Sequence, residues 1–188
     1  AMKGFNVICY DKRSDIIDSL KKKKIPFYEK GTEINLRKKF TQFKFTNNLD
    51  DLLICDIVFI SQDVPTDSKG KSNLSPINKS IKSTIKSINK NCNLVVLCQV
   101  PPGFTRSINW HKKKLYYQVE TLIFANALER ALFPERIIVG KENNKLDKKY
   151  FYYLKKFKSP ILEMNYESAE LAKISINIFL ISSVTSTN

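Results

Sequence analysis

An acidic side chain, Glu120, stands at the end of an apolar, strand-like run, Leu115 to Val119. A core strand has no use for a carboxylate at its tip, whereas open α/β sheets keep their ligands at the carboxyl ends of their strands. Lys173 and Asn177 lie four residues apart and share one face of an otherwise apolar helical segment. In a cleft, such a pair can stabilise a developing oxyanion. A structural ion pair between Glu170 and Lys173 is the alternative.

Asp11 follows a second apolar run, Phe5 to Tyr10. In a dinucleotide-binding fold, an acid at this place hydrogen-bonds the ribose hydroxyls. Such an acid stands about 20 residues after a G-x-G-x-x-G turn, and this sequence contains no such turn. Either the chain does not bind a dinucleotide, or it begins after its first strand. Read alone, Asp11 is also compatible with an ordinary turn.

Two further polar loops follow strand-like runs. The loop after 56–60 contains Val64, Pro65 and Thr66, and the loop after 94–98 begins at Gln99 and continues as V-P-P-G. Both loops would lie at carboxyl ends of strands, where cofactors bind in sheets of this kind. A plain surface loop is the alternative for the first. The single histidine, His111, stands next to three lysines, and we expect it on the surface without a catalytic role.

Strand-like and helix-like segments alternate along the chain. The strand-like runs are 5–10, 43–46, 56–60, 94–98, 115–119, 136–139 and 161–164; the helix-like segments are 14–22, 33–40, 76–89, the stretch that ends at 132, 148–157 and 168 onward. Isoleucines recur at helical spacing in 76–89, as in a helix that covers a sheet. The alternation predicts an α/β fold with a doubly wound, mostly parallel sheet, followed by the start of a long helix.

Composition narrows the classes of function. The net charge is +14, but the lysines are spread through every helix-like segment, which favours solvated faces over a nucleic-acid site. The hypothesis of a basic nucleic-acid-binding domain is supported by the net charge alone. No stretch approaches the roughly 20 apolar residues of a membrane helix, and the four cysteines have no CxxC spacing. We expect a reduced, cytoplasmic protein without a metal site and without a nucleic-acid or membrane partner.

Taken in order, these segments resemble the nucleotide-sugar dehydrogenases, the family that includes UDP-glucose 6-dehydrogenase and GDP-mannose dehydrogenase. The matching blocks are V-I-C-Y-D, I-P-F-Y-E-K-G, D-I-V-F-I-S-Q-D-V-P-T-D, C-Q-V-P-P-G, residues 119–140 and residues 168–188. The resemblance implies an NAD-dependent enzyme that oxidises the C6 alcohol of a nucleotide sugar, most of all UDP-glucose, to a carboxylate in two hydride transfers. In this family a cysteine holds the intermediate as a thioester, so that an aldehyde cannot escape between the steps.

The resemblance also implies roles for individual residues and a division of the chain. Glu120, Lys173 and Asn177 would be catalytic; Asp11, Val64, Pro65, Thr66 and Gln99 would bind NAD. Residues 1–165 would form a Rossmann-like NAD-binding domain that lacks its first strand. Residues 166–188 would begin a central helical region through which the full-length protein forms a homodimer.

The sequence departs from the family pattern in several places. The glycine-rich turn is missing, as is the later G-G-x-C-x-x-K-D block that carries the nucleophilic cysteine. Gln99 stands where the family has threonine, Phe124 where it has a second glutamate, and Val119 where it has proline. We therefore expect an internal piece of the cofactor-binding half, cut at both ends and without turnover of its own. A non-catalytic, Rossmann-type binding module derived from the family is the alternative.

Overall fold

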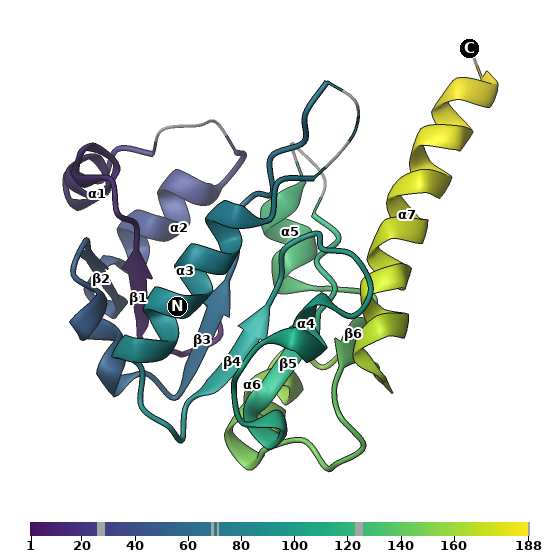
Figure 1. Cartoon of the computed structure of the whole chain (residues 1–188). Helices are drawn as coiled ribbons and strands as arrows, with labels where there is room; N and C mark the ends of the chain where they lie inside the picture. The colour runs from purple at the N-terminus through teal and green to yellow at the C-terminus, as the bar shows by residue number, and fades with distance from the viewer. Residues whose placement is uncertain (26–28, 69, 71, 123–125, 188) are drawn as a thin grey trace.

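The computed structural model describes residues 1–25, 29–68, 70, 72–122 and 126–187 (Figure 1). Its strands are β1 (Val7–Tyr10), β2 (Phe43–Thr46), β3 (Ile57–Ile60), β4 (Asn93–Val96), β5 (Leu115–Gln118), β6 (Ile137–Gly140) and β7 (Ile161–Met164). Its α-helices are α1 (Ser14–Lys21), α2 (Thr32–Lys38), α3 (Ser75–Ser87), α4 (Phe104–Ser107), α5 (Ala127–Leu132), α6 (Lys148–Lys155) and α7 (Tyr166–Thr187). Three short 3-10 helices are η1 (Phe40–Gln42), η2 (Leu49–Ile54) and η3 (Lys112–Lys114). Phe124 lies outside the described residues.

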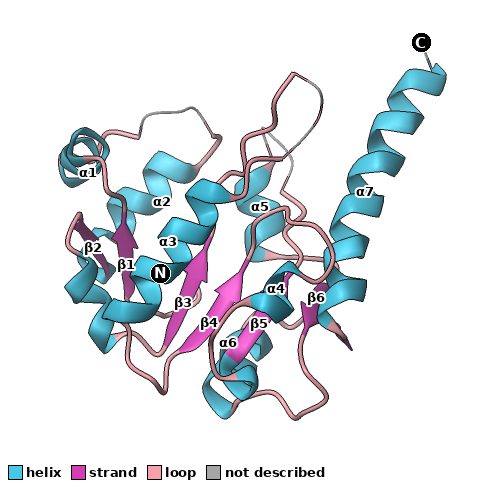
Figure 2. Ribbon diagram, in the orientation of Figure 1, coloured by secondary structure: helices cyan, strands magenta, loops and turns pink. Residues whose placement is uncertain are grey.

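The strands form two sheets (Figure 2). One contains β1 and β2, paired in parallel, and the other has the order β3-β4-β5-β6-β7. In the larger sheet only the β5–β6 pair is antiparallel. The prediction of an α/β fold with a mostly parallel sheet is therefore confirmed, and the carboxyl ends of β3, β4 and β5 lie at one edge.

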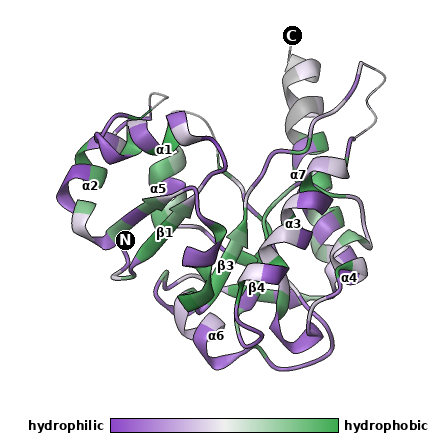
Figure 3. Ribbon diagram, turned by 60° about the vertical axis from the view of Figure 1, so that its left-hand side comes forward, coloured by the Kyte–Doolittle hydropathy of each residue, from purple (hydrophilic) through white to green (hydrophobic). Residues whose placement is uncertain are grey.

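The hydrophobic core lies on both faces of β4, whose residues Leu94, Val95 and Val96 have no exposed surface. Leu94 and Val96 belong to a cluster that includes residues of α3 and α7, whereas Val95 belongs to a cluster that includes residues of α6. Side chains of successive strand residues point to opposite faces, so a continuously apolar run is what a strand covered on both faces requires. Figure 3 shows β3 and β4 as green, hydrophobic ribbons among helices with purple, hydrophilic segments.

The boundary between the two sheets is less well buried than the centre. All four residues of β1 are only half-buried, and so are two of the four in β3, in contrast to the fully buried β4. Ile8 and Tyr10 of β1 nevertheless pack against the core cluster that contains Val58 and Ile60 of β3. The two sheets thus share apolar packing, while among the described residues no backbone ladder joins β1 to β3.

Helix α7 docks on the larger sheet through its first turn. A Cβ atom added at Gly140 would lie 2.8 Å from Cβ of Ala169 and 3.1 Å from Cα of Tyr166, so this position needs glycine for close approach. The Tyr166 hydroxyl donates a hydrogen bond to the main-chain oxygen of Leu115 at 2.9 Å. These contacts hold the start of α7 beside the start of β5 and direct the helix toward the carboxyl edge (Figure 1). Within the described ranges, no helix is long and apolar enough to cross a membrane.

Candidate functional site at the carboxyl ends of the strands

Three polar side chains form a stripe along α7, which we call the α7 stripe: Glu170, Lys173 and Asn177. Residues three, four and seven positions apart lie on the same face of a helix. Lys173 Nζ donates to the main-chain oxygen of Glu120, beyond the end of β5. Asn177 Nδ2 donates to Oε1 of Gln99, beyond the end of β4, at 2.5 Å. The structure therefore brings together four residues that the sequence singled out.

The charges of Glu120 and Lys173 are both opposed by their surroundings. Burial raises the pKa of Glu120, while a hydrogen bond from the Thr121 N–H and the charge of Lys173 act to lower it. Burial likewise lowers the pKa of Lys173, and the charge of Glu120 acts to raise it. An acid and a base whose pKa values are moved toward neutrality are suited to proton transfer near pH 7.

Glu170 is a residue whose part the sequence reasoning misjudged. Its side chain is fully buried, and its carboxylate accepts hydrogen bonds from the N–H groups of Gly103 at 2.6 Å and Thr105 at 2.7 Å. The alternative interpretation, an ion pair between Glu170 and Lys173, is therefore wrong. An acid on an apolar helix face was one part of the signal that could have identified this contact. The other was a glycine after two prolines, where backbone N–H groups become available as a helix begins.

The loop after β3 is closed by its own backbone. Asn73 N–H donates to the main-chain oxygen of Pro65 at 2.7 Å, and Thr66 forms an isolated antiparallel bridge with Ser72. Val64 is half-buried against the main core cluster, whereas Pro65 and Thr66 are exposed. Both exposed residues are accessible at the carboxyl edge of the sheet. Their assignment to a cofactor stays a prediction.

Asp11 lies on the smaller sheet, just beyond the end of β1. Its N–H donates to the main-chain oxygen of Thr46 at 3.2 Å, and its carboxylate accepts a hydrogen bond from the N–H of Arg13 at 2.9 Å. The Arg13 Nε atom lies 3.6 Å from the same carboxylate, which is 37% exposed. Asp11 thus serves a turn, as the plain interpretation expected, and still presents an accessible carboxylate.

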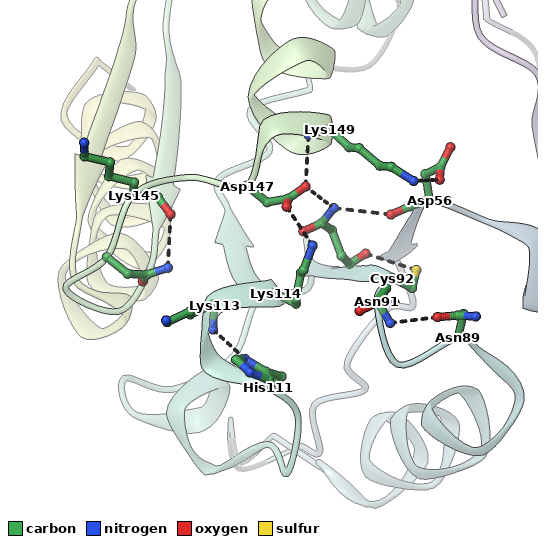
Figure 4. A network of polar contacts seen from close by, with 12 residues as sticks. Asp56, Asn89, Asn91, Cys92, His111, Lys113, Lys114, Lys145, Asp147 and Lys149 are labelled. Atoms are coloured by element: carbon green, nitrogen blue, oxygen red, sulfur yellow. Dashed lines mark hydrogen bonds and ion pairs between the residues drawn. The ribbon is translucent and has the colours of Figure 1, made fainter.

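The opposite edge of the sheet holds a compact polar network (Figure 4). Asp147 accepts hydrogen bonds from Lys114 Nζ at 2.6 Å, from Asn93 Nδ2 at 2.9 Å and from the N–H of Lys149 at 2.9 Å. Burial acts to raise the pKa of Asp147, but these donors outweigh it and lower the value to about 2. His111 is exposed at this edge, as predicted, and accepts a hydrogen bond from the N–H of Lys113. In the described part of the chain, no group of three His, Cys, Asp or Glu side chains could hold a metal ion.

The fold and the carboxyl-edge cluster together define a Rossmann-like α/β domain with polar residues gathered where such sheets bind ligands. Residues 1–158 match the NAD binding domain of the UDP-glucose/GDP-mannose dehydrogenase family, and the chain belongs to that family. The resemblance that the motifs indicated is thereby confirmed.

Curated relatives agree with this assignment, and solved structures share the fold. The UDP-glucose 6-dehydrogenases of Rickettsia typhi and Rickettsia bellii are 29% and 31% identical to the chain, each over 98% of it. The chain spans 45% of the length of these relatives. A GDP-mannose dehydrogenase from Pseudomonas aeruginosa superposes with a TM-score of 0.86 at 23% identity, covering 98% of this chain and 46% of that one. A UDP-glucose dehydrogenase from Pyrobaculum islandicum superposes with a TM-score of 0.81 at 23% identity, covering 95% and 45%.

Proposed function

We propose that this chain is part of an NAD-dependent nucleotide-sugar 6-dehydrogenase that resembles UDP-glucose 6-dehydrogenase and oxidises the sugar C6 alcohol to a carboxylate with two NAD. The observation that carries the proposal is the convergence of Lys173 and Asn177 of α7 with Glu120 at the carboxyl edge. Family membership and the names of the relatives point to the same chemistry. The substrate would be a nucleotide sugar.

In this proposal each residue has a distinct task. Oxidation of an alcohol leaves negative charge on the oxygen as its proton departs, and the Lys173 ammonium and the Asn177 amide can stabilise that charge. Glu120, whose pKa burial raises, can hold or release a proton beside them. NAD, when bound, would supply the acceptor for the hydride.

The chain fits part of a dinucleotide. Asp11 has an exposed carboxylate at the end of β1, suited to ribose hydroxyls, and the residues Val64, Pro65, Thr66 and Gln99 lie in loops at the ends of β3 and β4. The chain contains no G-x-G-x-x-G turn to hold the pyrophosphate. We infer that one further strand, which carries this turn, pairs between β1 and β3, where the two sheets share a core without a ladder.

Helix α7 supports the proposed division of the chain into an NAD-binding domain over 1–165 and the start of a dimerisation region over 166–188. In its first turns Tyr166, Ala169 and Glu170 have no exposed surface, whereas farther along the helix Ile178 is 58% and Phe179 is 71% exposed. Large apolar side chains that leave the domain on a helix favour cover by further protein. We propose that this cover forms part of a homodimer in the longer protein. The four cysteines are all free, which is usual for proteins of the cytoplasm, the location that we propose.

One observation favours the alternative, a non-catalytic binding module. The Asn177 amide is held by the Gln99 side chain at 2.5 Å, at the position where the family has a threonine. In that alternative the cluster serves to hold α7 against the sheet, and no substrate replaces Gln99 as the partner of Asn177. The dehydrogenase and the binding module differ in one respect that can be checked: whether a glycine-rich turn and a block with the nucleophilic cysteine are encoded next to this sequence.

The DNA on both sides of the reading frame decides between them. A G-x-G-x-x-G codon run about 20 codons before Asp11, with a G-G-x-C-x-x-K-D run downstream, would support the dehydrogenase. The protein read through both runs should then reduce NAD when UDP-glucose is added, measured as absorbance of the reduced nicotinamide. Stop codons on both sides would overturn the proposal in favour of the binding module.

A further inference from the structure

We propose that Glu170 is the positioning residue of the carboxyl-edge site: it fixes α7 to the loop 99–105 and thereby holds Asn177 and Lys173 where they meet Gln99 and Glu120. The functional meaning of this role rests on the function proposed above. The role itself is a matter of geometry within the chain.

The burial of Glu170 requires a specific reason. The side chain has no exposed surface and lies on an otherwise apolar turn of α7, next to the fully buried Ala169. A buried carboxylate is strongly unfavourable unless hydrogen bonds compensate it. The N–H groups of Gly103 and Thr105 provide two such bonds, one to each carboxylate oxygen. Hydrogen bonds to a charged acceptor are short and strong, so these two bonds hold α7 tightly against the loop.

The loop 99–105, to which Glu170 is hydrogen-bonded, has a restricted backbone. Gly103 has φ +89°, a left-handed conformation in which glycine is strongly preferred, and it places its own N–H toward the carboxylate as α4 begins. Between Gly103 and Gln99 lie Val100, which is almost fully buried, and two prolines, whose rings fix the backbone φ. A displacement at Gly103 is therefore transmitted to Gln99 rather than absorbed between them.

The helix completes the connection. Glu170 and Asn177 are seven residues apart, which is about 10 Å along a helix and almost the same direction around it. Asn177 Nδ2 donates to Gln99 Oε1 at 2.5 Å. Helix and loop thus meet at both ends of the loop: Glu170 binds Gly103 and Thr105, and Asn177 binds Gln99, and each connecting segment is rigid. Lys173 lies between these points on the same face and reaches Glu120. Loss of the buried contact between Glu170 and the loop should therefore alter the exposed contact between Asn177 and Gln99.

Glu167 offers a matched control. It precedes Glu170 by three residues on the same helix, and it also contacts α4, where its carboxylate accepts a hydrogen bond from Arg106 Nε at 2.5 Å. That contact is exposed and involves a side chain, whereas Glu170 binds the backbone of the loop. Glu167→Gln removes a charge of the same kind from the same helix without touching Gly103 or Thr105.

The test is NMR spectroscopy on the ¹⁵N-labelled chain with Glu170→Gln, in which an amide NH₂ replaces one acceptor oxygen. We expect hydrogen exchange at the Gly103 and Thr105 amides to become at least ten times faster, and the side-chain amide signals of Gln99 and Asn177 to shift. Glu167→Gln should leave all four signals as in the wild type. A purely structural Glu170 would lower the melting temperature without moving the Gln99 and Asn177 signals of the folded state.

A folded Glu170→Gln chain with unshifted Gln99 and Asn177 signals would overturn the proposal, as would equal shifts from Glu167→Gln. If Glu170→Gln does not fold, Glu170→Asp is the second variant, because it keeps the carboxylate on a shorter side chain. The same shifts of the Gln99 and Asn177 side-chain signals are expected there, and their absence would overturn the proposal. These readings need no turnover. The proposed function is tested separately, by NAD reduction in the protein read through both flanking runs, so a failure of that function and a failure of the positioning role are distinguishable.

Discussion

At the amino ends of the strands, Asp147 and Lys114 form an ion pair at 2.6 Å, and Asp147 has two further hydrogen-bond donors. At the carboxyl ends, Glu120 and Lys173 are again an acid and a lysine. Here, however, Lys173 donates its hydrogen bond to the main-chain oxygen of Glu120 instead of to its carboxylate. The pKa of Asp147 is lowered to about 2, because its donors outweigh burial. The pKa of Glu120 is raised, because burial outweighs its partners.

The difference indicates that the amino edge serves stability, and under the proposed function the carboxyl edge serves chemistry. A carboxylate with all its partners in place stabilises the folded state and does not readily exchange protons near neutral pH. A carboxylate whose pKa burial raises costs stability when it is charged, and its pKa moves toward the range in which side chains act in proton transfer. Helix α7 spans the distance between the two edges. It starts beside Leu115 at the amino edge and reaches Gln99 at the carboxyl edge.

The largest effect is expected at the carboxyl edge, in the longer protein that the proposed function requires. Lys173→Ala should lower kcat at least 100-fold, about 2.7 kcal/mol of transition-state stabilisation, with little change in NAD affinity. Lys82→Ala, which removes an exposed lysine from α3, is the control and should leave kcat unchanged. Steady-state rates with UDP-glucose and a separate NAD titration provide the two values. An unaltered kcat in Lys173→Ala would remove Lys173 from the catalytic site.

Helix α7 can be disturbed where it docks. Gly140→Ala places a Cβ atom 2.8 Å from Cβ of Ala169 and 3.1 Å from backbone of Tyr166, and overpacking of this kind costs roughly 2–3 kcal/mol of unfolding free energy. Urea denaturation of the chain measures the loss. Ala169→Gly removes the nearest clash, so the effect of Gly140→Ala should be smaller in that background. Strict additivity of the two substitutions would contradict this account of the docking contact.

At the amino edge, Asp147→Asn should lower the unfolding free energy by about 2 kcal/mol at pH 7, the value of a pKa shift from 3.8 to about 2. Because the folded-state pKa is depressed, this stabilisation is present above pH 4 and is lost as the pH falls toward 2. The difference between wild type and variant in urea denaturation should therefore shrink to about 0.4 kcal/mol at pH 2. Asp18→Asn, on the exposed face of α1, should change stability by less than about 0.5 kcal/mol.

Particular residues show how much of this could be read from the sequence. The apolar run around Leu94 predicted a central strand, because a strand covered on both faces has no room for polar side chains. The spacing of Lys173 and Asn177 predicted a shared helix face. By contrast, the antiparallel β5–β6 pair depends on how a long connection returns to the sheet, which no local pattern encodes. The grip of Glu170 on Gly103 joins residues that are 67 positions apart, and only the folded backbone brings an N–H to that carboxylate.

The smallest effect provides the sharpest comparison of the two edges, because the same chemical change is made at the other acid. Glu120→Gln should raise the unfolding free energy slightly at pH 7, by about 0.5 kcal/mol or less, where Asp147→Asn lowers it. Burial raises the folded-state pKa of Glu120, so its contribution to stability is present at low pH and is lost as the pH rises through that pKa. Urea denaturation at pH 7 and pH 4 should show a gain that shrinks on acidification. A loss of stability at pH 7 as large as that of Asp147→Asn would mean that Glu120 is a structural acid like Asp147, and the distinction between the two edges would fail.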